Sequence, residues 1–100
     1  MAQALIFEFD GLGRDDYDAV NAAVGIDTSN PDSDWPAGIL YHAAAAKPGG
    51  WVVFEVWESQ AAQEQFMYER LGAALAGAGV ASGPSRAQWL DLAAHTPITA

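Results

Sequence analysis

Four stretches of this chain have the pattern of β-strands. Residues 3–9 and 51–57 are rich in aromatic and branched residues, which favour strands, and residues 86–92 are similar. Residues 38–46 predict a further strand, although alanine, a poor strand former, is frequent there. Residues 47–50 form the turn Lys-Pro-Gly-Gly, which would join the second and third strands as a hairpin.

One helix is predicted over residues 14–24. Tyr17, Val20 and Val24 recur at intervals of three and four, which places them on one face of a helix. Gly25 follows directly and is a natural helix stop.

A second helix is predicted from Ser59, a plausible N-cap, to about Ala76. Its apolar stripe consists of Phe66, Met67, Leu71, Ala74 and Leu75. A long polar loop over residues 26–36 separates the first helix from the second strand.

The predicted element order is β-α-β-β-α-β, the ferredoxin-like pattern of the α+β class. Both helices would cover one face of a four-stranded antiparallel sheet, and the other face would lie bare. A bare sheet face normally alternates with polar residues, but residues 51–57 do not alternate. Trp51, Val53 and Trp57 point one way, whereas Val52, Phe54 and Val56 point the other. We therefore expect a second copy of the chain to cover the bare face in a homodimer.

The composition narrows the classes of partner. The chain has 100 residues, which indicates a single domain over 1–100, and 51% of them are hydrophobic. The net charge is −9, which argues against binding to nucleic acid or to an anionic membrane surface. The only cations are Arg14, Lys47, Arg70 and Arg86.

Several kinds of segment are missing from the sequence. There is no cysteine, so neither a disulfide framework nor a thiolate metal site is expected. The N-terminus does not have the pattern of a signal peptide, and no apolar stretch has the length of a membrane span. These observations predict an acidic cytoplasmic protein.

The junction between the third strand and the second helix resembles a known superfamily. Residues 52–59 read VVFEVWES, and Phe66 follows in the helix. This motif is similar to the same junction of the dimeric α/β-barrel superfamily, in its antibiotic biosynthesis monooxygenase-like branch. The resemblance implies a ligand cavity between the sheet and the helices of each subunit. It also implies relatives that include cofactor-independent oxygenases, haem-degrading enzymes, cyclases and proteins of unknown function.

The haem-degrading members are a poor match for this chain. They use an asparagine on the first strand, a tryptophan in the second helix and a histidine near the end of that helix. The corresponding residues here are apolar: Leu5 or Phe7, Phe66 and Leu75. We therefore expect neither haem nor another cofactor, and no metal.

His42, Glu55 and Arg70 are candidates for catalysis. His42, in the middle of the second strand, titrates near neutral pH and is a candidate general base. Glu55 and Glu8 lie within neighbouring strands, and a buried carboxylate needs a partner or a raised pKa. Arg70 is a candidate partner for either carboxylate. A structural role is open for all of them: a hydrogen-bonded core histidine, or a salt bridge, either of which also suits a subunit contact.

Five aromatic residues are candidates for ligand binding. They lie on the hairpin, on the second helix and at the end of the long loop: Trp35, Tyr41, Trp51, Trp57 and Phe66. They would equally suit a plain hydrophobic core. The acidic residues of the loop, among them Asp27, Asp32 and Asp34, depart from calcium-loop spacing and indicate a solvated loop.

Two functions remain open from the sequence. The first is an enzyme that binds a flat phenolic or polyketide-like substrate and oxidises it with dioxygen, cyclises it or isomerises it. The second is a non-catalytic dimeric ligand-binding or accessory protein. Whether His42, Glu55 and Arg70 line one cavity or are buried in an interface distinguishes the two.

Overall fold

The computed structural model describes residues 2–80 and 83–98 and contains one four-stranded sheet. Its strands are β1 (Gln3–Asp10), β2 (Ile39–Lys47), β3 (Gly50–Trp57) and β4 (Arg86–Asp91). They lie in the order β2-β3-β1-β4, and every neighbouring pair is antiparallel. Each predicted strand is present, with its ends shifted by about one residue.

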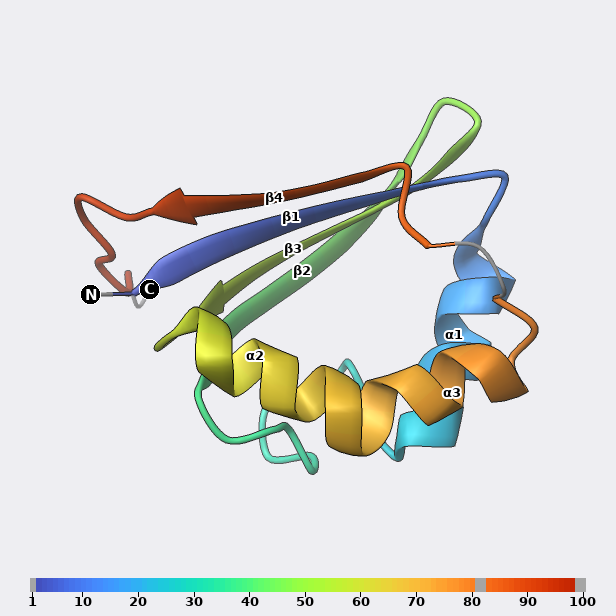
Figure 1. The fold of residues 1–100 in the computed structure, drawn as a ribbon, viewed down its shortest axis with the longest axis horizontal. Helices are drawn as coiled ribbons and strands as arrows, with labels where there is room; N and C mark the ends of the chain where they lie inside the picture. The colour runs from blue at the N-terminus through green and yellow to red at the C-terminus, as the bar shows by residue number, and fades with distance from the viewer. Residues whose placement is uncertain (1, 81–82, 99–100) are drawn as a thin grey trace.

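The helices all lie on one side of this sheet (Figure 1). They are α1 (Arg14–Val24) and a continuous second helix made of α2 (Gln60–Phe66), the π-helical turn η1 (Met67–Leu71) and α3 (Gly72–Gly77). The ferredoxin-like α+β fold expected from the sequence is therefore confirmed. No helix in the described part of the chain is both long and apolar enough to cross a membrane.

The ends of the helices follow from their sequence. At the start of α1, the backbone N–H of Gly13 donates to the carboxylate of Asp16 at 3.0 Å. At its end, Gly25 adopts φ of 90°, a left-handed conformation that favours glycine. The hydroxyl of Ser59 accepts from the backbone N–H of Ala62 at 3.2 Å, so Ser59 caps α2 as expected.

The hairpin between β2 and β3 requires a glycine at its base. A Cβ atom on Gly50 would lie 2.1 Å from the backbone oxygen of Phe9, far inside van der Waals contact. The backbone N–H of Gly11 also donates to the oxygen of Gly49 at 2.8 Å. These contacts fix the hairpin turn against the end of β1.

The pleat of the sheet separates its residues into two faces. The inner face, toward the helices, carries Leu5, Phe7 and Phe9 of β1 opposite Glu55, Val53 and Trp51 of β3. The outer face carries Ala4, Ile6 and Glu8 of β1 opposite Val56, Phe54 and Val52. The expected division of β3 into two apolar faces is therefore present.

The hydrophobic core lies between the inner face and the helices. Its buried members are Leu5, Ile26, Trp57 and Phe66, with Trp57 fully buried. This core fills the end of the molecule near α2. Toward α1 and α3 the sheet and the helices are separated by a pocket.

Candidate functional site

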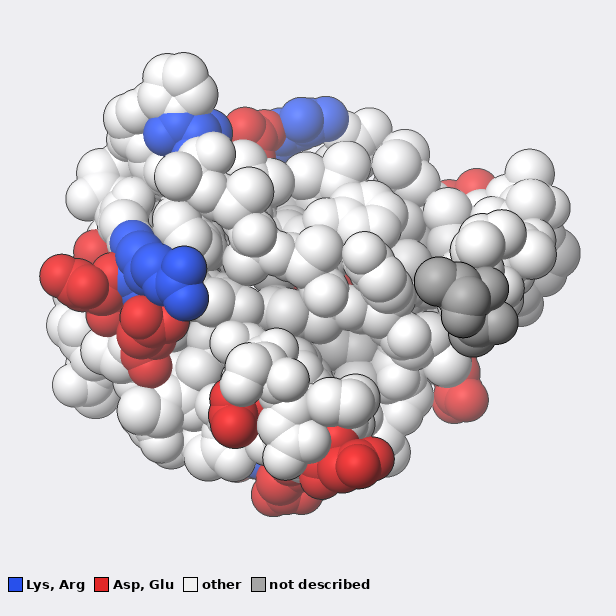
Figure 2. Space-filling view, turned by 180° about the vertical axis from the view of Figure 1, so that it is seen from behind, with Lys and Arg blue, Asp and Glu red and all other residues white. Residues whose placement is uncertain are grey.

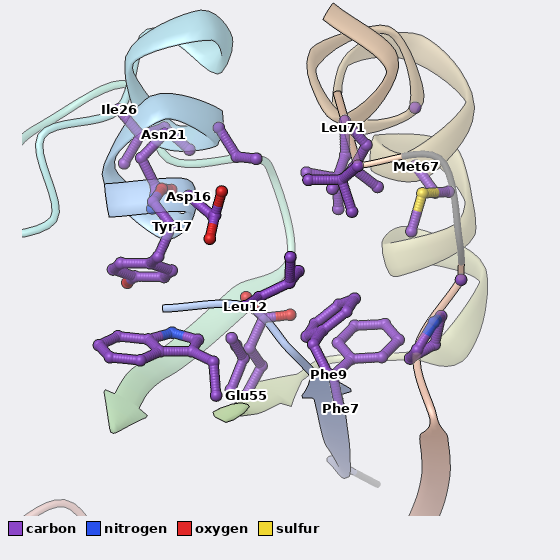
Figure 3. Close-up of a pocket in the computed structure, with 18 of the residues that line it drawn as sticks. Phe7, Phe9, Leu12, Asp16, Tyr17, Asn21, Ile26, Glu55, Met67 and Leu71 are labelled. Carbon is purple, nitrogen blue, oxygen red and sulfur yellow. The ribbon is translucent and has the colours of Figure 1, made fainter. Parts of the chain in front are cut away.

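A pocket of about 490 Å³ lies between the inner face of the sheet and the helices. Its floor includes Phe7 and Phe9 of β1, and Figure 3 shows Met67 and Leu71 of η1 across from Tyr17 of α1. This volume is within the range of about 300–1,000 Å³ that is usual for small-molecule sites. Most of its lining is apolar, so the few polar side chains in it determine its chemistry.

Three of these polar side chains form a chain of hydrogen bonds. Nδ1 of His42 lies 2.9 Å from Oε2 of Glu55, and Nε2 of the same ring is hydrogen-bonded to the hydroxyl of Tyr17. A carboxylate accepts hydrogen bonds, so Glu55 fixes the proton of His42 on Nδ1. Nε2 is then the basic nitrogen, and the Tyr17 hydroxyl donates to it.

The Glu55 end of this chain is held inside the protein. The second oxygen, Oε1, accepts from the indole N–H of Trp57 at 3.1 Å. The side chains of His42 and Glu55 are 13% and 10% exposed, so solvent screens their interaction weakly. Both carboxylate oxygens are paired, which orients the carboxylate toward the imidazole.

The Tyr17 end of the chain stays protonated over a wide pH range. Burial raises the pKa of the Tyr17 hydroxyl, and the negative charge of Glu55 raises it further. A protonated phenol can accept a proton from a ligand hydroxyl while it gives its own proton to His42. Tyr17, His42 and Glu55 can therefore act together as a proton relay, which we call the Tyr-His-Glu chain.

Two tryptophans complete the polar half of the pocket. The rings of Trp35 and Trp51 lie 5.2 Å from those of His42 and Tyr17, respectively. Trp51 is 9% exposed, and its indole nitrogen has no hydrogen-bond partner among the residues that the structure describes. A buried donor without an acceptor is unusual, and a bound molecule could supply the missing group.

The structure brings five of the sequence candidates together. The pocket is lined by His42, Glu55, Trp35, Trp51 and Phe66. The sequence indicated no specific partner for His42, and in the structure Glu55 lies directly opposite it on the neighbouring strand. Their roles in catalysis and binding stay predictions.

The expected position of Tyr41 is wrong. Tyr41 is 54% exposed and packs against Phe54 on the outer face, with the ring centroids 6.3 Å apart. The cause is an irregularity in β2: Ile39 lies opposite Trp57, but Tyr41 lies opposite Val56. The bulge shifts the alternation by one residue, which turns Tyr41 outward.

Trp57 and Arg70 also lie outside the pocket lining. Trp57 is fully buried below the pocket, where it packs on Phe66 and supports Glu55. The guanidinium of Arg70 lies over the ring of Phe66 and bonds to Asp34 at 3.2 Å. The expectation that Arg70 pairs with a strand carboxylate is therefore wrong, because the long loop supplies a nearer one.

Glu8 lies on the outer face rather than near Glu55. It is paired with Arg86 at 3.0 Å and with Lys47 at 3.4 Å. These cations hold the pKa of Glu8 below its ordinary value, the hydrogen bond from Arg86 being the largest cause. Lys47 also bonds to Asp10 at 2.9 Å, so these four residues form an outer ion cluster.

Tyr17 is a polar member of the site that its sequence pattern did not indicate, because its spacing also fits the apolar face predicted for residues 14–24. The signal was its helical spacing with Asn21, because the two lie one turn apart and both line the pocket. Asp16 also lines the pocket (Figure 3).

Four apolar residues were matched above to the positions that the haem-degrading relatives use for their functional side chains. Of these, Phe7, Phe66 and Leu75 line the pocket, whereas Leu5 lies only in the core.

The described residues contain no cluster of three or more His, Asp or Glu side chains placed to hold a metal ion.

Solved structures with the same fold come from several bacteria. A protein described as a "putative Antibiotic biosynthesis monooxygenase" from Chloroflexus aurantiacus matches with a TM-score of 0.70 and 15% identity, over 99% of this chain and 100% of that chain. A protein of unknown function from Nitrosomonas europaea matches with a TM-score of 0.67 and 16% identity, over 99% and 96% of the two chains.

A third match is to a variant of SnoaB from Streptomyces nogalater, described as a cofactor-independent oxygenase. Its TM-score is 0.63 and its identity is 10%, over 97% of this chain and 98% of that chain. The chain has the fold of the antibiotic biosynthesis monooxygenase-like proteins. This agrees with the resemblance at residues 52–59. No protein-family model and no curated protein matches the sequence.

Proposed function

We propose that the protein is an enzyme that removes a proton from a flat phenolic or polyketide-like substrate and oxidises it with dioxygen, without a cofactor. The single observation that carries this proposal is the Tyr-His-Glu chain in the wall of a mostly apolar pocket. A base that is oriented by a carboxylate and shielded from water is the arrangement that proton removal requires.

The geometry suggests the path of the proton. A substrate hydroxyl gives its proton to the oxygen of Tyr17, and the proton of Tyr17 passes to Nε2 of His42. The imidazolium that forms is stabilised by the carboxylate of Glu55, 2.9 Å from Nδ1. The proton removal leaves the substrate as an electron-rich phenolate or enolate.

The oxidation balances with one dioxygen molecule. A methylene group between two aromatic rings loses two hydrogens and becomes a carbonyl. One oxygen atom of dioxygen becomes the carbonyl oxygen, and the other leaves as water with the two hydrogens. Dioxygen accepts four electrons in this step, all of which come from the substrate, so no other reductant is needed.

Two further observations support the proposal. Phe7, Phe9 and Trp51 offer flat apolar surface on which an aromatic substrate can stack. SnoaB, which has the same fold, is described as a cofactor-independent oxygenase.

The test is the oxidation of 1,8-dihydroxyanthrone, a tricyclic phenol with a reactive methylene, followed with an oxygen electrode and by mass spectrometry of the product. We expect the wild-type rate to exceed the spontaneous rate, and His42→Gln to lower it by about a hundredfold or more. Tyr17→Phe should also lower the rate, because the relay loses its hydroxyl. The controls are His95→Gln and Tyr68→Phe, since both of these residues are exposed.

Each other result has a defined meaning. Product that forms without oxygen uptake indicates a cyclisation or isomerisation, which starts with the same proton removal. Binding without turnover indicates a ligand-binding protein. A His42→Gln variant that is as active as the wild type contradicts the proposed role of the relay.

We also propose that the protein is a homodimer that pairs through the outer sheet face. This face carries the partly exposed side chains of Ile6, Val52 and Phe54, together with the exposed Tyr41 and Leu90. Apolar side chains on a bare sheet face favour a cover, and a second copy supplies the same apolar surface.

A further inference from the structure

We infer that the pocket selects uncharged substrates and rejects those that carry a carboxylate or another anionic group. This inference rests on the proposed function, because it concerns the substrate class of the same pocket. It follows from the charges in the pocket wall and from the positions of the cations in the chain.

The described lining contains two carboxylates and no lysine or arginine. Asp16 is one of them, and Figure 3 shows it on α1 above the pocket floor. Glu55 is the other, on the opposite side in β3. An anionic ligand would therefore enter a weakly screened space that already holds negative charge.

Protonation of His42 does not change the sign of this charge. Glu55 lies 2.9 Å from His42, so a protonated imidazole would be neutralised by its own partner. With neutral His42 the pair carries the charge of Glu55. In both cases Asp16 remains, and the net charge of the pocket is negative.

All four cations of the chain lie outside the pocket lining and are paired with carboxylates there. Arg14 pairs with Asp18 on the outside of α1, and Arg70 pairs with Asp34 of the long loop. Lys47 and Arg86 belong to the outer ion cluster. On the molecular face shown in Figure 2, Lys and Arg side chains lie toward the margin and uncharged side chains cover the centre.

The polar groups that do line the pocket suit a neutral hydroxylated ligand. Tyr17 can exchange hydrogen bonds with a hydroxyl, and Asn21 offers an amide. Aromatic and aliphatic side chains surround these groups. A phenol without an ionised substituent fits this wall, whereas a carboxylated phenol would lose its hydration without gaining a cation.

The experiment compares two ligands that differ in one substituent, which is uncharged in one and anionic in the other. Chrysophanol and rhein share a dihydroxyanthraquinone ring, on which chrysophanol carries a methyl group and rhein a carboxylate. Both are already oxidised, so the measurement is independent of turnover. By titration calorimetry at neutral pH, we expect rhein to bind at least about tenfold more weakly.

Two variants connect this difference to the pocket charge. Asp16→Asn keeps an acceptor for the N–H of Gly13 but removes one charge, so the ratio of the two affinities should fall by about threefold or more. Asp15→Asn is the matched control, because Asp15 is exposed, adjacent in the chain and outside the pocket lining. It should leave the ratio close to its wild-type value.

The outcomes separate this inference from the proposed function. Equal binding of the two ligands overturns the inference, even if the enzyme oxidises 1,8-dihydroxyanthrone. A preserved preference for chrysophanol without any turnover overturns the proposed reaction and supports the inference. If neither ligand binds, the pocket is not a site for flat aromatic molecules, and both proposals are wrong.

Discussion

Glu55 and Glu8 lie on the two central strands of one sheet but on opposite faces, and their surroundings are opposite as well. The Glu55 side chain is 10% exposed and is paired with an imidazole and an indole N–H. Glu8 is partly exposed and is paired with Arg86 and Lys47. Glu55 is thus paired with a histidine, whereas Glu8 is paired with an arginine and a lysine, both of which are positively charged at neutral pH.

This difference shows how one sheet can present two kinds of surface. On the inner face a carboxylate beside histidine can stabilise a charge that appears during a reaction. On the outer face the charge of the Glu8 carboxylate is already compensated by two cations, so it is not available to stabilise a charge that appears during a reaction. Substitutions at matched positions on the two faces should therefore have different effects.

The largest effect is expected on turnover. Glu55→Gln removes the charge that stabilises protonated His42, so kcat/KM for 1,8-dihydroxyanthrone should fall by about a hundredfold or more. Glu8→Gln makes the same chemical change on the outer face and should leave kcat/KM close to the wild-type value. Equal losses in the two variants would mean that the faces do not differ in the proposed way.

The next effect is on subunit association. If the outer face is the dimer interface, Phe54→Asp buries an unpaired charge in it and should weaken the dimer by about a hundredfold or more. Light scattering at micromolar concentration should then show a dimer for the wild type and a monomer for the variant. A matched control is Tyr68→Asp, since Tyr68 is 91% exposed on η1. A monomeric wild type would contradict the predicted dimer.

The smallest effect is on the pH dependence of stability. The folded pKa of Glu8 is lowered from its ordinary value of 4.5, chiefly by the hydrogen bond from Arg86. A carboxyl with a lowered pKa stabilises the fold above its unfolded pKa, and this contribution is lost as the pH falls through the folded value. Asp10 shifts in the same direction because of Lys47.

Replacing Glu8 should therefore flatten the acid side of the stability curve. Urea unfolding midpoints of Glu8→Gln should change less than those of the wild type as the pH falls from neutral to below about 4.5, because the wild type alone loses this interaction. The effect is small in the single chain, because Asp10 and Arg86 of the cluster are exposed there. An unchanged slope would show that the outer ion cluster has no measurable influence on folding.

The fold was predictable because its signals are local. Residues 51–57 are apolar on both faces, α1 has helical spacing, and Gly25 and Ser59 mark helix ends through their own backbone and side-chain preferences. The junction at 52–59 then narrowed the fold to one superfamily. None of these inferences required knowledge of contacts between distant residues.

The site was predictable only in part, because its geometry depends on such contacts. Simple alternation places Ile39 and Tyr41 on the same face, but the bulge in β2 turns Tyr41 outward and His42 inward. The relay also needs Tyr17, which is 25 residues away from His42 in the chain. Arg70 pairs with Asp34 because the long loop folds against the second helix. No local sequence pattern predicts where this loop lies.

The π-helical turn η1 places Met67 and Leu71 in the pocket wall and accommodates one more residue per turn than the α-helix on either side. Because a π-helical turn takes up the extra residue locally, deleting one residue here should restore a regular α-helix and leave α3 facing nearly the same way. Leu75 and Ala76 of α3 should then stay in the pocket wall, and the change should be confined to the wall around Met67 and Leu71. The shape of this part of the pocket is thus tied to a single inserted position, which can be removed without moving the rest of the wall.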